Sequence, residues 1–456
     1  MGRAMEQSKM AMEQDVAKTP YTTMSPDVLV IGGGPAGSTV SALLADRGYD
    51  VVMLEKEHHP RFHIGESLLP MNMPLFDRLG VRKEVEAMGI TKYGAEFVSP
   101  WHDHTSHFFF AEAMDKSFPY AVHVRRSEFD EMLFRHAAKR GARTFEGHRV
   151  TRVDMDAGKM GDGRALVKVK SGDGAEIEWH PRFVIDASGR DTVLSNQFGV
   201  KRRSKEHASA ALFGHFTNAV RQPGRNEGNI SLFWFDHGWF WFIPLLDGTT
   251  SIGAVASPTY FKQRKTDPST FLMETIALAP KLAARLKDAK MVEPATATGN
   301  FSYNSEFCRG DRFIMIGDAF TFVDPMFSSG VLLAMKSGFL AADAIDIGLR
   351  QPAKMPRQLK AFEKSVSKGL AGFTWLIFRM TTPVMREMLM YPRNILGVEH
   401  AVLAILAGDV HDNPQAQLRM KLFKLMYYIG SLRTLPSSLR AWARRRRMIR
   451  PEVFET

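Results

Sequence analysis

The first part of the chain alternates short apolar runs with a glycine-rich turn and a helical pattern. Residues 27–31 (DVLVI) are mostly apolar and β-branched, which predicts a strand buried on both faces of a parallel sheet. The glycine-rich residues 32–37 (GGGPAG) follow directly, and residues 38–47 predict a helix that Gly48 ends. Residues 50–54 (DVVML) predict a second buried strand. These elements form a compact βαβ unit within about 30 residues.

The rest of the chain carries antiparallel, parallel and helical patterns in turn. The expected elements are a hairpin at residues 165–169 and 176–179, short buried strands at 183–186 and 312–316, an antiparallel sheet within 230–256, a helix at 331–349 and a helical region from 356 onward. No apolar run approaches the ~20 residues of a membrane-spanning helix.

Composition and charge limit the function classes. Apolar residues make up 45% and charged residues 24% of the 456, a globular balance that excludes a mainly disordered chain. The single cysteine, Cys308, excludes an internal disulfide and a cysteine metal cluster, so a reducing, cytoplasmic location is expected. The net charge is +11, but ten basic residues and no acidic one lie between Pro414 and Arg450. The remaining chain is nearly neutral, which disfavours a general nucleic-acid-binding surface.

Three glycines next to the first strand indicate a dinucleotide site. Gly32, Gly34 and Gly37 match G-x-G-x-x-G, with Pro35 and Ala36 inside the motif. The first glycine permits the tight turn, the second lets the backbone approach a pyrophosphate, and the third allows close packing of helix on strand. Glu55, followed by Lys56, comes about 20 residues later at the end of the second strand, where a carboxylate accepts the ribose hydroxyls.

Three further segments favour FAD over NAD. Residues 126–130 (RSEFD) resemble the R-x-x-F-D segment of the FAD-dependent aromatic-hydroxylase superfamily. Residues 186–190 (DASGR) and 317–319 (GDA) resemble that superfamily's later cofactor segments, so Arg126, Asp186, Gly317 and Asp318 are expected cofactor residues. The resemblance implies an α/β fold: a Rossmann-like FAD-binding domain of the glutathione-reductase and p-hydroxybenzoate-hydroxylase type, an antiparallel-sheet substrate domain and a helical C-terminal region.

These widely spaced segments predict a discontinuous first domain. The expected division is a disordered leader at 1–24, an FAD-binding domain at 25–100, 118–200 and 300–350, a substrate-side domain at 101–117 and 201–299, and a helical region with a basic tail at 351–456. The chain carries no second G-x-G-x-x-G motif, which mildly favours reduction of the flavin by a separate flavin reductase.

Residues 239–244 (WFWFIP) are the most specific motif. Tryptophans at i and i+2 of a strand point to one face, where packing a core is a sufficient physical explanation. The pattern W-x-W-x-I-P also resembles the signature of flavin-dependent halogenases, and the resemblance extends over residues 27–349. It implies that Trp239, Trp241, Ile243 and Pro244 shield the flavin from the substrate.

Two other segments resemble the same family. Residues 62–70 (FHIGESLLP), with Glu66 and Ser67, resemble its segment beside the flavin. Residues 324–330 (DPMFSSG) resemble its halide loop, with Ser328, Ser329 and Gly330 as expected halide ligands. Free N–H groups at the start of a helix suit a small anion, although Ser329 could also be a plain helix cap.

Lys92, in residues 89–95 (GITKYGA), resembles the family's essential lysine. On composition alone, a lysine between glycines is a solvated surface residue. The family's tryptophan halogenases carry a glutamate where this chain has Phe327, so a phenol or pyrrole, free or tethered to a carrier protein, is the expected substrate type. The resemblance implies reduced FAD (FADH₂), O₂ and chloride or bromide as reactants and no metal site.

The basic tail leaves three interpretations open. Apolar residues at helical spacing (Leu418, Leu422, Leu425, Met426, Ile429) alternate with Arg419, Lys421 and Lys424, and a basic run follows at 440–447. A packed helix with a solvated tip, docking of an acidic carrier protein and a membrane-surface contact all fit this pattern.

Two other functions also remain open. One is an FAD monooxygenase or prenyl-type reductase of the same fold. The other is a flavin-binding scaffold protein that acts through its tail.

Overall fold

The glycine-rich turn leaves the central strand of a five-stranded parallel sheet. The strands lie in the order β20 (Phe313–Met315), β11 (Phe183–Asp186), β1 (Val28–Ile31), β2 (Val51–Leu54) and β7 (Arg143–Phe145), and each pair is parallel. Every residue of β1, β2 and β11 is buried, which explains their uninterrupted apolar sequences. Helix α2 (Pro35–Asp46) joins β1 to β2 and packs against α5 (Arg126–Lys139) and α10 (Gly330–Arg350). The predicted βαβ unit is confirmed.

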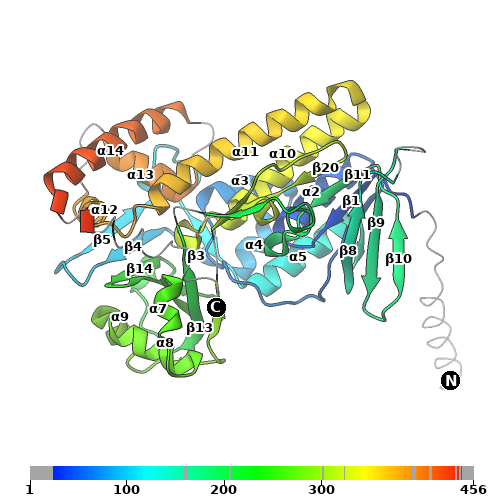
Figure 1. Ribbon diagram of the computed structural model, residues 1–456. Helices are drawn as coiled ribbons and strands as arrows, with labels where there is room; N and C mark the ends of the chain where they lie inside the picture. Colours follow the sequence, from blue (N-terminus) through cyan, green and yellow to red (C-terminus); the bar gives the residue numbers. More distant parts are fainter. Residues whose placement is uncertain are drawn as a thin grey trace, which may run out of the picture.

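The computed structural model describes residues 24–157, 163–204, 207–299, 302–322, 324–392, 397–409, 413–436, 439–440 and 443. The predicted leader, apart from Met24, and the arginines at 444–447 lie outside these residues. At one end of the molecule is the sheet of β8 (His148–Asp154), β9 (Leu166–Ser171) and β10 (Glu176–Trp179), which contains the predicted hairpin (Figure 1). Short elements complete this half: α3 (Met73–Leu79), α4 (Arg82–Met88), β3 (Ile90–Lys92), β6 (Ala121–His123) and α6 (Val193–Gln197).

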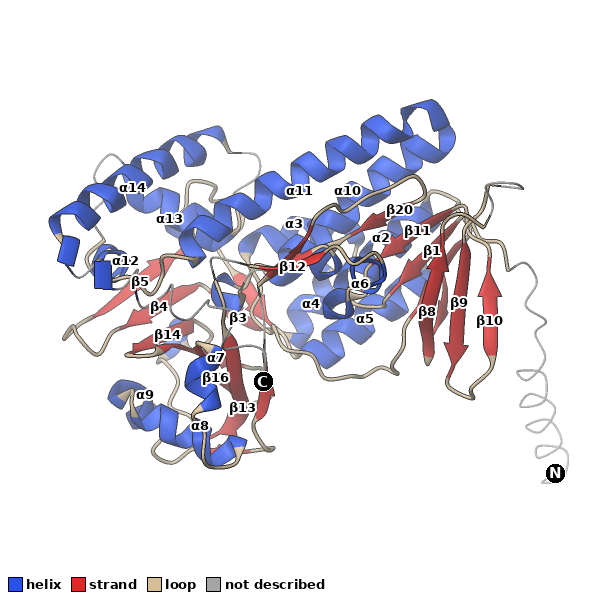
Figure 2. Cartoon of the chain, in the orientation of Figure 1, coloured by secondary structure: helices blue, strands red, loops and turns tan. Residues whose placement is uncertain are grey.

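A larger sheet forms the second half of the molecule. Its order is β17 (Lys290–Met291), β13 (Ala210–Thr217), β16 (Thr250–Ala256), β15 (Gly238–Pro244), β14 (Ile230–Phe235), β4 (Gly94–Val98) and β5 (Thr105–Phe109), with β18 (Thr296–Thr298) also on β13. Helices α7 (Pro258–Lys262), α8 (Pro268–Ala277) and α9 (Pro280–Arg285) accompany it (Figure 2). The antiparallel arrangement predicted for residues 230–256 is confirmed.

The sheet pairing differs from the predicted domain division in two places. Strand β4, expected in the first domain, pairs with β5 and β14 of the larger sheet. Strand β12 (Lys201–Arg203), expected in the second domain, pairs with β19 (Tyr303–Ser305), which in turn pairs with β21 (Thr321–Phe322). Both differences come from hydrogen bonds between strands that are far apart in sequence.

Strand β15 separates two cores by simple alternation. Trp239, Trp241 and Ile243 belong to the core that continues into the five-stranded sheet. Phe240 and Phe242 point to the opposite face, where they pack with residues of α8 and α9. The tryptophan pair therefore faces the first half of the molecule.

The C-terminal region is helical, as expected. It consists of α11 (Met355–Ile377), α12 (Pro383–Met390), α13 (Val398–Ala407) and α14 (Pro414–Arg433), and α12–α14 gather beside β4 and β5 (Figure 1). Among the described residues, no helix combines the length and the apolarity needed to span a bilayer.

The packed face of α14 differs from the one that the first of the three interpretations, a packed helix, would require. Ala416, Phe423 and Tyr427 are its buried residues, whereas Leu418, Leu425 and Ile429 of the predicted stripe are exposed. The aromatic rings decide the orientation, because Phe423 and Tyr427 pack edge-on against Trp375 of α11.

Candidate functional site

A cavity opens where four parallel strands end. The segments that follow the carboxyl ends of β1, β2, β11 and β20 all line it, together with residues 61–67, part of β15 and the start of α10. Its empty volume is about 1840 Å³, including the space at the mouth. The carboxyl edge of a parallel sheet is where open α/β folds bind their ligands.

The glycine turn forms one wall of the cavity. Gly32 has φ +101°, and a Cβ there would lie 2.5 Å from the Ala187 carbonyl oxygen. A Cβ on Gly37 would lie 1.9 Å from the Gly32 carbonyl oxygen, so Gly37 packs helix on strand and does not line the cavity. Gly34 is the N-cap of α2 without a side-chain cap, and a Cβ there would meet only Arg61, at 3.6 Å. The open side of the turn, with Pro35 and Ala36, therefore faces the cavity.

Glu55 and Lys56 line the neighbouring part of the cavity. Glu55 is buried, and its two carboxylate oxygens accept hydrogen bonds from Gly33 N at 2.8 Å and Glu57 N at 3.0 Å. Lys56 forms an ion pair with Asp191 at 2.6 Å, which joins the β2 and β11 loops. Glu55 is thus held rigidly at the cavity wall.

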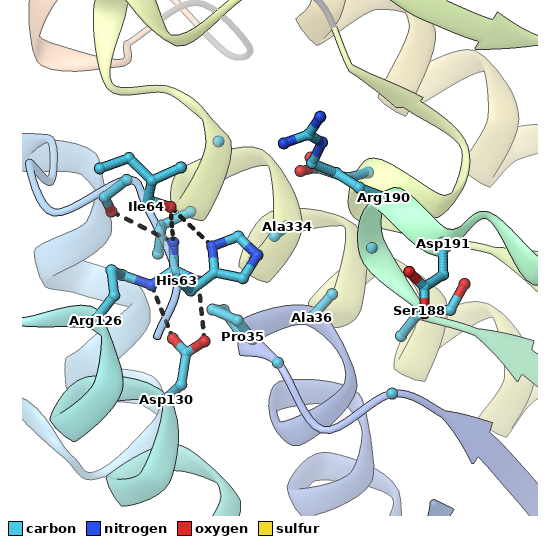
Figure 3. Close-up of a pocket in the computed structure, with 18 of the residues that line it drawn as sticks. Pro35, Ala36, His63, Ile64, Arg126, Asp130, Ser188, Arg190, Asp191 and Ala334 are labelled. Carbon is cyan, nitrogen blue, oxygen red and sulfur yellow. Dashed lines mark hydrogen bonds and ion pairs between the residues drawn. The ribbon is translucent and has the colours of Figure 1, made fainter. Parts of the chain in front are cut away.

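Arg126 ties helix α5 to residues 61–67. Its guanidinium donates to both carboxylate oxygens of Asp130, at 2.8 and 3.0 Å, and to Ile64 O at 3.0 Å. Figure 3 shows this group and His63 on one side of the cavity, with Ser188, Arg190 and Asp191 on the other. Although burial opposes ionisation of Asp130, Arg126 holds the pKa of this carboxyl below its usual value. Burial and Arg126 together lower the pKa of His63 to about 4, so the ring is neutral.

Two further predicted FAD residues, like Gly37, do not line the cavity; they support its loops. Asp186 accepts hydrogen bonds from Ser188 N at 2.9 Å and Leu194 N at 2.7 Å, so its carboxylate shapes the loop whose residues 187–191 line the cavity. Gly317, with φ +57°, packs against Ala334 of α10. Asp318 lines the cavity, and burial raises the pKa of its carboxyl to about 6.

The tryptophan pair forms the wall contributed by the larger sheet. Trp239, Trp241 and Ile243 line the cavity, and the ring centroids of the two indoles lie 6.2 Å apart. Trp241 Nε1 donates to Ser251 Oγ at 3.1 Å, which fixes the ring. Pro244 is absent from the lining and pairs with Thr250 at the end of β15.

Lys92 lies directly behind the segment of residues 61–67. It is 2% exposed, and its Nζ donates to Ser67 Oγ at 3.0 Å and Leu68 O at 3.1 Å. Ser67 lines the cavity, whereas Lys92 does not. Burial lowers the pKa of Lys92 to about 7, so the amine is about half protonated near neutrality.

The predicted halide loop lies at the start of α10. Ser328, in a left-handed conformation with φ +55°, and Gly330 line the cavity. Ser329 is the buried N-cap residue of α10, its hydroxyl makes no capping bond, and it does not line the cavity. Asp324 holds the loop, accepting from Met326 N at 3.1 Å and Ser209 Oγ at 2.5 Å. Phe327 is buried beside this loop, and its side chain supplies no carboxylate there.

The geometry fits FAD. A glycine turn with an uncapped helix start suits a pyrophosphate, and the carboxylates of Glu55 and Asp318 suit hydroxyl groups. Among the described residues, the buried Glu66 Oε2 at the cavity wall has no hydrogen-bond partner. The described part of the chain also contains no cluster of three or more His, Cys, Asp or Glu that could hold a metal.

Comparison with known proteins decides the family. The family model of the FAD binding domain matches residues 25–363. A flavin-dependent halogenase of Armillaria mellea is 34% identical over 351 residues, covering 72% of this chain and 68% of that one. The chain belongs to the flavin-dependent halogenase family.

Two bacterial enzymes with named substrates are also similar in sequence to this chain. A tryptophan 2-halogenase of Chondromyces crocatus is 35% identical over 70% of this chain, which spans 61% of that enzyme's length. A 1H-pyrrole-2-carbonyl (peptidyl-carrier protein) chlorinase of Pseudomonas fluorescens is 28% identical over 89% of this chain and 94% of that one.

Two solved structures share the fold over most of the chain. The myxobacterial chondrochloren halogenase has a TM-score of 0.74 at 30% identity, covering 90% of this chain and 91% of that one. A flavoprotein/dehydrogenase from Cytophaga hutchinsonii has a TM-score of 0.80 at 28% identity, covering 90% of this chain and 99% of that one. The predicted family and FAD-binding fold are confirmed.

Several residues that line or support the candidate site were not predicted. Arg61 lines the cavity outside any recognised motif, and His63 and Arg190 line it from within the motif segments 62–70 and 186–190 without having been singled out. His215 of β13 bonds Glu66 through Nε2 and Oε1 at 2.7 Å, although the two residues are 149 positions apart. His123 lies on the same face of the β3–β6 pair as Lys92, and its ring nitrogens are buried without a hydrogen-bond partner in the described chain. No local sequence signal marks such pairings, because strand register brings them together.

Gly253 is expected to control the position of Trp241. It lies opposite Trp241 in the β15–β16 ladder, and a Cβ there would come within 2.2 Å of the indole ring. We expect Gly253→Ala to displace the ring and lower the free energy of unfolding by about 1–3 kcal/mol, measured by denaturant titration. Gly214→Ala on β13 is the matched control, because its Cβ would meet only Met291 and Phe216 side chains, the nearest atom at 3.5 Å. Equal stability of the two variants would contradict this packing.

Proposed function

We propose that this protein installs chloride or bromide on an electron-rich aromatic substrate, with Lys92 as the residue that delivers the halogen. The observation that carries the proposal is the Lys92 amine, buried next to Ser67, with its pKa lowered to about 7. Such an amine stands close to a cavity that fits FAD, with a tryptophan wall on the opposite sheet. A solvated lysine would have neither property.

Residues of the first domain would hold the cofactor. The turn at Gly32–Gly34 with Pro35 and Ala36 would take the pyrophosphate, Glu55 and Lys56 the adenosine end, and Arg126 and Asp318 the part nearer the flavin ring. When bound in its reduced form, FAD would supply with O₂ the oxidising equivalents that convert halide to hypohalous acid. A separate flavin reductase would provide the reduced cofactor.

The remaining wall residues would bind halide and exclude the substrate. Backbone N–H groups at Ser328–Gly330 and the start of α10 suit a small anion. Trp239, Trp241 and Ile243 would keep the aromatic substrate away from the flavin and disfavour direct hydroxylation. Ser67 lies between the cofactor cavity and Lys92, and Glu66 lines the cavity next to it.

Lys92 would then act on hypohalous acid in one of two ways. As an ammonium it would hydrogen-bond the acid, and as a neutral amine it would take up the halogen and release water. Ser67 Oγ and Leu68 O hold the amine in place. The neutral form is the nucleophile, and burial makes it available near pH 7.

The substrate class follows from Phe327 and one relative. Because no carboxylate stands at position 327, a ring that readily loses its proton, a phenol or pyrrole, is favoured. The similar Pseudomonas fluorescens enzyme is named for a carrier-bound pyrrole. A carrier-tethered aromatic is therefore proposed beside the free compound.

Turnover with defined components tests the function. The protein would be incubated with FAD, a flavin reductase, NADH, bromide and a panel of phenols, pyrroles, tryptophan and a carrier-bound pyrrole, followed by mass spectrometry. A product with the bromine isotope pair is expected. Hydroxylated or alkene-reduced product would overturn the proposal in favour of a monooxygenase or prenyl-type reductase, and FAD binding without any product in favour of a scaffold protein.

The rate of halogen transfer is expected to rise with pH. With the pKa of Lys92 at about 7, the neutral amine increases from about pH 6 to about pH 8 and then reaches a plateau. Single-turnover measurements that start from pre-reduced enzyme separate this step from flavin reduction. A flat profile, or one that falls over this range, would contradict a neutral amine as the acceptor.

A further inference from the structure

Helix α14 exposes a continuous apolar stripe. Leu418, Leu425, Ile429 and Leu432, here called the α14 stripe, are 68%, 54%, 45% and 70% exposed. Their spacing places all four within about 60° around the helix axis. Leu435 and Leu439, beyond the helix end, are 48% and 54% exposed. Isolated exposed leucines are common, but a row of them on one helix face indicates a contact surface.

The stripe is not the face that holds α14 to the protein. The opposite face carries Ala416, Phe423 and Tyr427, which are buried against neighbouring elements, with Trp375 between α11 and α14. The helix is therefore already anchored, and folding of the chain leaves the stripe uncovered within the described residues. Figure 1 shows α14 along the outer edge of the molecule, with α12 and α13 between it and strands β4 and β5.

Positive charge flanks the stripe on both sides. By helical periodicity, Arg419 and Arg433 lie on one side and Lys421 and Lys424 on the other. The sequence contains no acidic residue between Asp412 and Glu452, and it continues past α14 with Arg440 and four successive arginines at 444–447. Whatever covers the stripe must therefore tolerate or carry negative charge.

We propose that α14 docks on an anionic lipid surface. A basic helix with an apolar stripe lies in the membrane interface, with the stripe in the acyl boundary and the lysines and arginines at the headgroups. The stripe itself is aliphatic, and the exposed Tyr428 beside it is held by hydrogen bonds from Trp375 and Arg379. Protein contact sites instead concentrate their binding energy in aromatic residues and arginine and under-represent leucine. A second copy of α14 fits poorly, because facing stripes would bring the basic flanks together.

Vesicle flotation with the full FAD-loaded chain tests this contact. Vesicles of neutral phosphatidylcholine are compared with vesicles that contain phosphatidylglycerol. The test variant combines Leu425→Asp and Leu432→Asp. The matched control combines Leu278→Asp and Val292→Asp, two residues 52% and 51% exposed outside α14. Retained flavin absorbance and thermal unfolding show that each variant is folded.

We expect the wild type and the control to float with anionic vesicles, with partition into neutral vesicles at least about tenfold lower. The α14 variant is expected to lose at least about tenfold of the anionic partition. Absence of flotation, or flotation that the α14 variant retains, would overturn the proposal. A second result would also overturn it: the wild type forms a dimer or a complex with an acidic carrier protein, only the α14 variant loses that assembly, and wild-type partition into vesicles stays at background. None of these results depends on the proposed halogenation.

Discussion

Replacing Lys92 by alanine is expected to lower the rate of halogenation by roughly a thousandfold, the scale of a lost proton-transfer or nucleophilic group. FAD binding is expected to stay close to wild type, because Lys92 does not line the cavity. The measurement is single-turnover product formation, with bound FAD quantified by absorbance. Lys92→Met keeps the volume of the side chain, so it separates loss of the amine from loss of packing.

The stability of the methionine variant is a second readout. The pKa of Lys92 is lowered on folding from 10.5 to about 7, so between these values the unfolded chain binds the extra proton. Folding is therefore penalised below about pH 10, fully so below about pH 7, and stability rises with pH across this window. Lys92→Met removes the penalty, and we expect its unfolding free energy at pH 7 to match or exceed that of the wild type.

Lys281→Ala is the matched control for Lys92. Lys281 is a partly buried lysine that, like Lys92, makes two hydrogen bonds through Nζ, here to Ser99 O at 3.2 Å and His102 O at 2.6 Å. It is expected to change stability but not the rate of halogen transfer. If Lys92→Ala and Lys281→Ala lowered that rate equally, Lys92 would have a structural role only.

Gly37→Ala is expected to abolish FAD retention. Its Cβ would lie 1.9 Å from the Gly32 carbonyl oxygen and 3.3 Å from Ala187 Cβ. The first of these contacts is with backbone, so the clash can be relieved only by moving α2 away from β1. We expect a loss of about 3–5 kcal/mol in unfolding free energy, measured on the FAD-free protein, together with loss of FAD during gel filtration.

Gly34→Ala serves as the paired variant at the same turn. Its Cβ would meet only Arg61, at 3.6 Å, so the fold should be retained. The methyl group would project on the cavity side, where the backbone must approach the cofactor, and FAD affinity should fall without loss of stability. Wild-type stability of Gly37→Ala, or destabilisation by Gly34→Ala, would contradict the assigned packing.

The glycine turn and the tryptophan strand show what local pattern can predict. The bounds expected for β1, β2 and β11 agree with the structure to within a residue, because a strand buried on both faces needs an unbroken apolar run. Alternation along β15 likewise places Trp239 and Trp241 on one face. The glycines of the turn could be predicted because the steric limits that require them act between neighbouring backbone segments.

Asp186 and α14 show where local pattern was insufficient. The acidic residue at the end of β11 was expected to contact the cofactor, but it does not line the cavity, and its carboxylate accepts hydrogen bonds from Ser188 N and Leu194 N of the following loop. In α14, the hydrophobic pattern marked a leucine stripe but left open whether it packs or stays exposed. The fit of Phe423 and Tyr427 against Trp375 selected the other face.

The sequence by itself indicated the family and the FAD-binding fold through the resemblance of its motifs. It also predicted the βαβ unit and the strands around the cavity, since strand periodicity and backbone sterics depend on neighbouring residues. Only the tertiary structure decided that Lys92 is buried against Ser67, that His215 bonds Glu66, and which face of α14 remains exposed. Each of these depends on strand register and on the shape of a distant surface. Strand register and surface shape are fixed only when the whole chain packs, so no short stretch of sequence predicts these contacts.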